Sequence, residues 1–141
     1  LGQLEDLPDE VLSVLRQVEV DTAHCTTMTL RLALSYGGRQ EIATAVKQVC
    51  QKVSVGELAI DDVTPELIQN NLYDSQMPDP DLVIRTANEH RLSNFLLWQA
   101  SYAEFYFVEK LWPEFRRGDL GEAVLNYSQR LRKFGKVVEN D

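Results

Sequence analysis

The sequence predicts an α/β fold with a partly parallel sheet and flanking helices, and three observations carry this prediction. Apolar residues recur at helical spacing in segments that begin near residues 9, 41 and 119. Short strand-like runs lie between or beside these segments, at residues 28–34, 81–85 and 105–108. Such alternation of helices and strands is typical of a mostly parallel sheet. The length of 141 residues suits one domain.

Four elements are predicted in the first half: a helix over residues 9–22, a strand over 28–34, a helix over 41–53 and a short helix over 65–73. Pro8 suits the first turn of the first helix, where a missing N–H costs nothing. The strand is expected to stop at the glycine turn of residues 36–39, which we interpret as structural. Thr64 and Pro65 predict an N-cap and a first-turn proline.

Four more elements are predicted in the second half: a strand over residues 81–85, a helix over 94–102, a strand over 105–108 and a helix over 119–134. Ser93 and Asp119 are the expected N-caps of the two helices. Gly135 is expected to end the last helix. Three strands would leave exposed sheet edges, so the pattern indicates part of a larger sheet.

The composition excludes several function classes. Lys plus Arg is 14 and Asp plus Glu is 22, a net charge of −8 that argues against nucleic-acid binding. No apolar run approaches the roughly 20 residues of a membrane-spanning helix. The cysteines, Cys25 and Cys50, form no CxxC pair, and only His24 and His90 could contribute imidazoles to a metal site.

The polar loop of residues 85–94 contains the residues best suited to bind an anion. It follows a predicted strand and precedes a predicted helix, where open α/β sheets bind ligands. Arg85 and Arg91 can each grip a phosphate with two hydrogen bonds, and Ser93 adds a hydroxyl donor. The loop therefore predicts a phosphate site. The alternative, a solvated loop with incidental charges, stays open on spacing alone.

Residues 81–99 resemble the signature of the cis-prenyltransferases, the undecaprenyl and dehydrodolichyl diphosphate synthase family. They read Asp-Leu-Val-Ile-Arg-Thr-Ala-Asn-Glu-His-Arg-Leu-Ser-Asn-Phe-Leu-Leu-Trp-Gln, with Asn88 where the family usually has glycine. The resemblance continues through residues 34–42, 102–107, 111–115 and 132–135. It implies that residues 1–141 are the C-terminal portion of a single cis-prenyltransferase domain. The N-terminal catalytic portion, with its Asp-Gly-Asn-Gly-Arg-Arg-Trp-Ala block, is expected to lie before Leu1.

The resemblance also implies roles for individual residues. The family condenses isopentenyl diphosphate with an allylic diphosphate, such as farnesyl diphosphate, to form cis-polyprenyl diphosphate. Arg85, Arg91 and Ser93 match the positions that hold isopentenyl diphosphate. Glu104 matches a carboxylate that helps to hold Mg²⁺. His90 matches a position near the diphosphates, where orienting a phosphate and assisting proton loss both stay open.

Glu104 also has a second interpretation. We expect it at the end of a helix, where the helix dipole disfavours a carboxylate, so that a metal ligand is the favoured role. The alternative is a surface carboxylate or an ion-pair partner for an arginine such as Arg85.

We therefore expect a Mg²⁺-dependent transferase that forms a homodimer through the apolar segments around residues 95–107 and does not bind nucleic acid. A cytoplasmic location with peripheral membrane contact is expected, and a plastid stays open. Two alternatives remain: a non-catalytic binding or scaffold subunit of a hetero-oligomeric cis-prenyltransferase, and an inactive fragment. Residues 1–141 alone are expected to be inactive.

Overall fold

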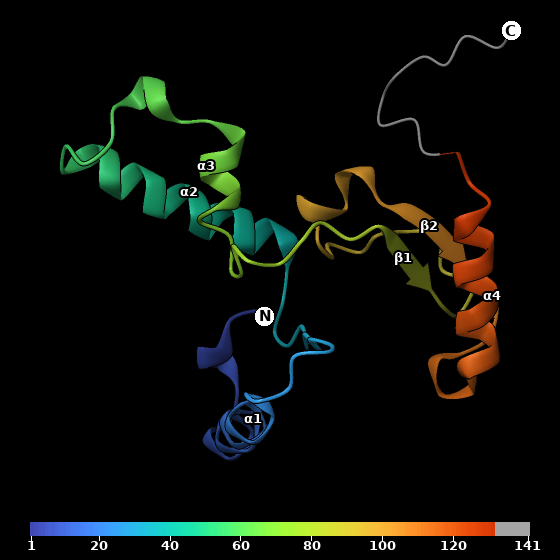
Figure 1. The fold of residues 1–141 in the computed structure, drawn as a ribbon. Helices are drawn as coiled ribbons and strands as arrows, with labels where there is room; N and C mark the ends of the chain where they lie inside the picture. The colour runs from blue at the N-terminus through green and yellow to red at the C-terminus, as the bar shows by residue number, and fades with distance from the viewer. Residues whose placement is uncertain (132–141) are drawn as a thin grey trace, which may run out of the picture. The chain divides into compact units, whose positions relative to one another are not determined.

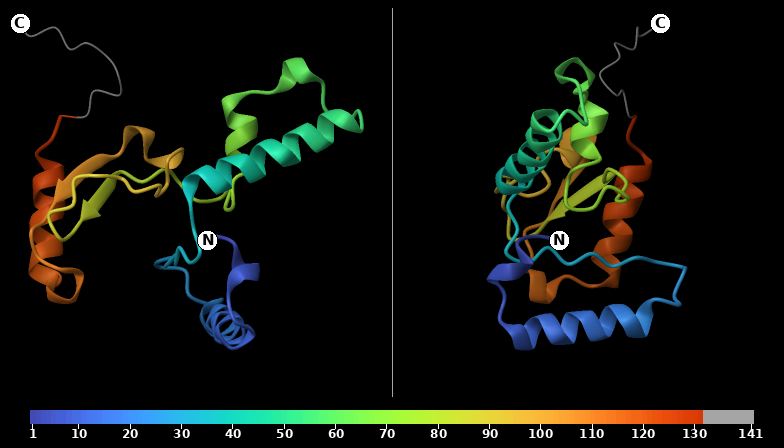
Figure 2. Two further views of the ribbon diagram at one scale, coloured as in Figure 1. Left: turned by 180° about the vertical axis from the view of Figure 1, so that it is seen from behind. Right: turned by 90° about the vertical axis from the view of Figure 1, so that its left-hand side faces the viewer.

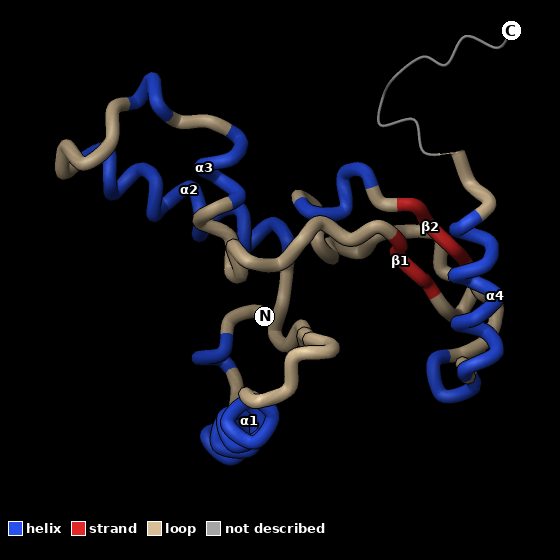
Figure 3. The backbone as a smooth tube through the Cα atoms, in the orientation of Figure 1, coloured by secondary structure: helices blue, strands red, loops and turns tan. Residues whose placement is uncertain are grey.

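A computed structural model describes residues 1–131 of the chain. The chain divides into two compact units, Leu1–Met77 and Pro78–Asp141, and each is considered by itself. Residues 1–131 form four α-helices and two strands, labelled in Figure 1, and both strands, red in Figure 3, lie within the second unit. Within the described residues, no helix is long and apolar enough to cross a membrane.

The first unit is helical. Its elements are α1 (Asp9–Thr22), α2 (Gly38–Ser54) and α3 (Pro65–Gln69), with 3₁₀ helices at Leu4–Asp6 and Ile60–Asp62. The predicted cap of α3 is confirmed, because the Thr64 hydroxyl oxygen accepts the Leu67 N–H at 3.2 Å. This short helix folds back against α2 (Figures 1 and 2).

A buried carboxylate holds the ends of α2 and α3 together. Ala45, Val49 and Leu72 form the apolar core here, and Glu41 is buried beside them with only 1% exposed. Its Oε1 accepts the Tyr73 N–H at 3.1 Å, and its Oε2 accepts the Tyr36 hydroxyl. A buried carboxyl group is tolerated when its oxygens are hydrogen-bonded in this way. The predicted glycine turn over residues 36–39 is wrong, because Gly37 is extended and Gly38 and Arg39 already belong to α2; the structural role rests on Tyr36 and its bond to Glu41.

The predicted strand over residues 28–34 is wrong for the described structure, in which this segment is an irregular loop. Only its end is paired: the Leu1 amino group donates to the Leu32 carbonyl at 2.7 Å, and the Leu34 N–H donates to the Leu1 carbonyl at 2.9 Å. Met28 and Leu30 stay 79% and 75% exposed. Alternating apolar residues produce a strand only where a neighbouring strand pairs with them.

The second unit contains the sheet. β1 (Leu82–Arg85) and β2 (Glu104–Phe107) are parallel, with Leu82 opposite Glu104 and Arg85 opposite Phe107. Short 3₁₀ helices lie before β2 at Gln99–Tyr102 and after it at Trp112–Glu114, and α4 (Arg117–Ser128) runs beside β2 (Figures 1 and 2). Leu96, Ala100 and Ala123 are buried. The predicted fold class, α/β with a small parallel sheet and flanking helices, is confirmed.

Two helix predictions in this unit need correction. A helix over residues 94–102 does not form, because Ser93, Asn94 and Leu96 have φ angles of 53°, 63° and 44°, outside the right-handed helical region. The segment makes turns instead and ends in the 3₁₀ helix Gln99–Tyr102.

The last helix begins at Arg117, so Asp119 lies inside its first turn rather than at the N-cap. Its carboxylate accepts the Arg116 N–H at 2.7 Å, which is the reciprocal half of a capping box. α4 ends at Ser128, before the predicted end. Residues 132–135, including Phe134 and Gly135, lie outside the described residues.

Candidate functional site

The loop of residues 86–94 is anchored at the carboxyl ends of the two strands. Its first residues are hydrogen-bonded to the segment after β2: Ala87 N–H to the Lys110 carbonyl at 2.8 Å and Asn88 N–H to the Val108 carbonyl at 2.9 Å. Ala87 and Asn88 have φ angles of 61° and 51°, in the left-handed region that asparagine tolerates better than most residues. These bonds fix the first residues of the loop next to the segment that follows β2.

The segment after β2 is in turn tied to α4 by an ion pair. The Lys110 ammonium donates to the Asp119 carboxylate. This hydrogen bond, reinforced by the Arg116 N–H, lowers the pKa of Asp119 below its usual range. The same bond with Asp119 raises the pKa of Lys110. Both groups therefore stay charged near neutral pH. Their ion pair fixes the segment after β2, to which the loop is hydrogen-bonded.

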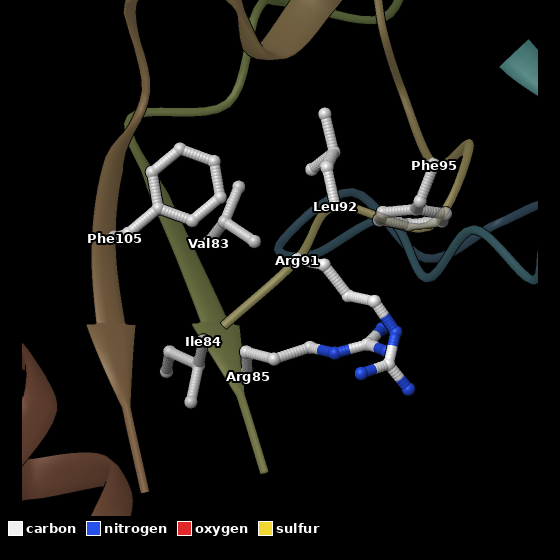
Figure 4. Close-up of a pocket in the computed structure, with 7 residues that line it drawn as sticks. All are labelled: Val83, Ile84, Arg85, Arg91, Leu92, Phe95 and Phe105. Carbon is white, nitrogen blue, oxygen red and sulfur yellow. The ribbon is translucent and has the colours of Figure 1, made fainter. Parts of the chain in front are cut away.

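An open hollow of about 190 Å³ lies between the loop and β1. Its lining combines apolar side chains with two arginines: Val83, Ile84, Leu92, Phe95, Phe105, Arg85 and Arg91. Figure 4 shows both guanidinium groups on one side of the hollow, away from the Phe105 ring. The hollow therefore offers a cationic part and an apolar part to one ligand.

Three of the predicted site residues come together here. The Arg85 Nη2 donates to the Ser93 Oγ at 3.3 Å, and Arg91 lines the same hollow as Arg85. Among residues 1–131, no carboxylate lies within ion-pair distance of Arg85. Arg91 is instead paired with Glu89, and its side chain is 69% exposed. The pairing with Glu89 was not predicted, although the two charges stand two residues apart in the sequence.

His90 lies at the edge of this site, on the face of the sheet that carries Arg85. Its Nε2 is 2.7 Å from the Asn88 Oδ1, and its ring lies on Phe107 with centroids 4.4 Å apart. Phe107 is opposite Arg85 in the register, and paired residues of parallel strands point to the same face. The contact with Phe107 was not predicted, because sequence spacing does not show which rings meet across a loop.

Glu104 lies apart from these residues. It begins β2 opposite Leu82, and Leu82 precedes Arg85 by three residues, about 10 Å along the strand. Successive side chains of a strand alternate between the two faces, so an odd separation changes the face. Glu104 and Arg85 therefore point to opposite faces of the sheet. The expected position at a helix end is wrong, since a strand begins at Glu104, and the argument from the helix dipole does not apply.

An arginine occupies one oxygen of Glu104. Arg130 donates from Nη1 to the Glu104 Oε2 at 2.8 Å, while its Nε and Nη2 donate to the Asn126 Oδ1 at 3.0 and 2.8 Å. The ion-pair partner is thus Arg130 and not Arg85. Within residues 1–131, no group of three or more His, Cys, Asp or Glu side chains is placed to hold a metal ion.

Comparison with known proteins identifies relatives over nearly the whole chain. A family model described as "Putative undecaprenyl diphosphate synthase" matches residues 1–135. An isoprenyl transferase of Listeria monocytogenes is 45% identical over 135 residues, which cover 96% of this chain and 54% of that protein. A tritrans,polycis-undecaprenyl-diphosphate synthase (geranylgeranyl-diphosphate specific) of Picrophilus torridus is 41% identical over 136 residues, or 96% and 53% of the two chains.

Solved structures of proteins with similar names also match this chain. Lavandulyl diphosphate synthase from Lavandula x intermedia, crystallised with dimethylallyl diphosphate, matches with a TM-score of 0.93 and 37% identity over 96% of this chain and 58% of that one. A "probable undecaprenyl diphosphate synthase" from Campylobacter jejuni matches with a TM-score of 0.82 and 40% identity, over 96% and 61%. The chain spans somewhat more than half the length of each relative. It belongs to the cis-prenyltransferase family, the family of the undecaprenyl diphosphate synthases.

Proposed function

We propose that the hollow beside β1 binds the diphosphate of isopentenyl diphosphate, and that the protein containing this chain condenses it with an allylic diphosphate to form a cis-polyprenyl diphosphate. The observation that carries the proposal is the meeting of Arg85 and Arg91 at one hollow, with Ser93 bonded to Arg85. Two guanidinium groups on one side of an apolar cavity suit a ligand with an anionic head and a hydrocarbon tail.

The two arginines would act differently on that ligand. Arg85 is half-buried and already oriented by Ser93, so that it can receive a phosphate with little loss of side-chain freedom. Arg91 is exposed and paired with Glu89. A diphosphate carries more negative charge than one carboxylate, so it would draw Arg91 away from Glu89 and toward the hollow.

In the proposed reaction, the alkene of isopentenyl diphosphate forms a carbon–carbon bond with the allylic carbon, the allylic diphosphate leaves, and one proton is lost. This chain would contribute by positioning the isopentenyl group and by neutralising its diphosphate. The side chains of Val83, Leu92 and Phe105, which line the hollow, would contact the hydrocarbon part. His90 retains its two roles, orienting a phosphate or accepting the proton.

Mg²⁺ is part of the proposal as the cofactor of the whole protein, where it would neutralise charge on diphosphate oxygens. Glu104 suits a hard cation by its chemistry, but only as a single ligand: one oxygen is bonded to Arg130, and the side chain points away from the face of Arg85. The other ligands would come from the substrate or from outside residues 1–131. No step of the reaction is derived through the metal.

A homodimer, peripheral contact with a membrane and a cytoplasmic location complete the proposal. The dimer is the part that the described surface supports best, because Phe95 and Phe107 on the loop and strand remain 38% and 39% exposed. Light scattering on the full-length protein measures the oligomeric state, and sedimentation with phospholipid vesicles measures membrane contact.

The full-length protein that contains this chain is the material for the main test. It would be incubated with labelled isopentenyl diphosphate, farnesyl diphosphate and Mg²⁺, and we expect labelled polyprenyl diphosphate. Arg85→Ala should lose binding of isopentenyl diphosphate, while Arg117→Ala, which removes an exposed arginine at the start of α4, should retain it. Binding without product would favour the non-catalytic subunit, and absence of both would favour the inactive fragment.

A further inference from the structure

Asn88 presents its side-chain amide directly to His90. The left-handed backbone at Ala87 and Asn88 turns the loop, and the Asn88 N–H is fixed to the Val108 carbonyl at 2.9 Å. The Asn88 Oδ1 then lies 2.7 Å from the His90 Nε2. Because an amide oxygen only accepts hydrogen bonds, Nε2 is the nitrogen that carries the hydrogen in this contact.

An aromatic row holds the other side of the His90 ring. The ring lies on Phe107 with centroids 4.4 Å apart and planes tilted by 37°. Phe107 stacks in turn on Phe105, with centroids 5.9 Å apart, and Phe105 lines the hollow. The row therefore leads from the hollow to His90 along one face of β2.

We propose that Asn88 is a positioning residue for His90: together with Phe107 it fixes the ring with its hydrogen on Nε2, which leaves Nδ1 as the nitrogen free to act on a bound diphosphate. This inference deepens the proposed function and rests on it. A neutral ring held in this way can accept a proton at Nδ1, and a protonated ring can donate from Nδ1 to a phosphate. In both roles the bond at Nε2 sets which nitrogen acts.

The charged groups around His90 bear on any titration of the ring. Glu89 and Arg91 flank it in the loop and are paired with each other, and Arg85 ends the strand on the same face. Glu109 and Lys110 follow Phe107, with Lys110 paired to Asp119. Asn88 is the neutral neighbour among these groups, so replacing it by a carboxylate changes the field at Nε2 directly.

The first experiment compares Asn88→Gly with Ala87→Gly in the full-length protein. Glycine adopts the left-handed backbone freely, so both variants keep the turn, but only Asn88→Gly removes the amide. We expect Asn88→Gly to lower kcat about threefold or more, in the range that one lost hydrogen bond produces, and Ala87→Gly to match the wild type. Equal rates for the two variants would overturn the positioning role.

The second experiment follows His90 by NMR titration in the wild type and in Asn88→Asp. A carboxylate at position 88 stabilises the imidazolium, and we expect the pKa of His90 to rise by about half a unit to one unit. The pH profile of kcat/KM should move by the same amount. An equal pKa of His90 in the wild type and in Asn88→Asp would show that the Asn88 contact does not form. A pKa that moves while the pH profile stays fixed would show that the ring is held but takes no part in the reaction.

The two experiments separate this inference from the proposed function. A wild-type protein without prenyl transfer and without binding of isopentenyl diphosphate would reject the proposed function, and with it the positioning role. An active wild type in which Asn88→Gly equals Ala87→Gly would reject the positioning role alone.

Discussion

Arg85 and Arg91 are the same residue type in one hollow, yet their surroundings give them different properties. The Arg85 side chain is half-buried and hydrogen-bonded to Ser93. The Arg91 side chain is 69% exposed and forms an ion pair with Glu89. An exposed ion pair contributes about 0–1 kcal/mol to stability, so losing Arg91 should affect folding little. Its contribution should appear when an anion enters the hollow.

Replacing Arg91 by alanine should therefore raise the KM for isopentenyl diphosphate in the full-length protein. Hydrogen bonds to a charged group contribute about 1.5–3 kcal/mol, and about 1.4 kcal/mol corresponds to a factor of ten. We expect an increase of tenfold or more. Steady-state kinetics at saturating farnesyl diphosphate measures it, with Arg117→Ala as the matched control. An unchanged KM would remove Arg91 from the site.

Glu104→Gln tests the proposed metal ligand. A neutral amide binds a hard cation more weakly than a carboxylate, so the Mg²⁺ concentration for half-maximal turnover should rise. The control is Glu109→Gln, which changes an exposed glutamate just after β2. The partner Arg130 is half-buried, so the variant should also lose some stability, which thermal unfolding measures. A Mg²⁺ titration that overlays the wild type, combined with lower stability, would leave Glu104 as the ion-pair partner of Arg130 only.

The sequence predicts the arginine site better than the surroundings of Glu104, for a physical reason. Arg85, Arg91 and Ser93 lie within nine residues: the two arginines line the same hollow, and Ser93 accepts a hydrogen bond from Arg85. The partner of Glu104, Arg130, lies 26 residues away, just after the end of α4. No local pattern encodes such a contact, because it depends on how α4 packs beside β2. The Asn88–His90 bond is local, but it requires the left-handed backbone of the loop.

At the scale of elements, the same distinction between local and non-local determinants decides which predictions hold. The runs at 82–85 and 104–107 are rich in β-branched and aromatic residues and pair with each other, so both strands form. The segment 28–34 has the right alternation but lacks a full partner strand among the described residues. The helix over residues 94–102 fails through backbone angles at Ser93 and Asn94 that its composition does not reveal.

The ion pair between Arg31 and Asp74 makes a pH-dependent link inside the first unit. The Arg31 Nε donates to the Asp74 Oδ2 at 2.7 Å, and about a quarter of each side chain is exposed. The Arg31 hydrogen bond lowers the pKa of Asp74, and partial burial opposes this effect. A carboxyl whose pKa is lower in the folded state stabilises the fold above its unfolded pKa, about 3.9, and loses that stabilisation as the pH falls through the folded value.

Asp74→Asn should therefore destabilise the protein at pH 7 and matter little in acid. We expect a loss of about 1 kcal/mol in the free energy of unfolding at neutral pH. The difference from the wild type should shrink as the pH falls below about 4 and through the lowered pKa of Asp74. Urea unfolding at several pH values measures it, with the exposed Asp61→Asn as control. A difference that stays constant across this range would show that the carboxylate charge does not carry the stabilisation.

At the scale of the whole chain, both units leave large apolar side chains exposed. Val14, Met28 and Leu30 are more than 60% exposed in the first unit, as are Trp112 and Leu131 in the second. Apolar surface of this extent is typical of regions that further chain or another subunit covers. The relatives are longer than this chain, which covers 54% of the Listeria isoprenyl transferase and 58% of the lavandulyl diphosphate synthase.

We predict on this basis that residues 1–141 alone do not transfer prenyl groups. The proposed reaction joins two diphosphate substrates, whereas the hollow of about 190 Å³ offers the guanidinium groups of Arg85 and Arg91 to one diphosphate head. The measurement incubates the purified chain with labelled isopentenyl diphosphate, farnesyl diphosphate and Mg²⁺, beside the full-length protein as the positive control. We expect product from the full-length protein and only background from the chain. Long-chain product from residues 1–141 above a no-protein control would mean that both substrate sites and the catalytic groups lie within these residues.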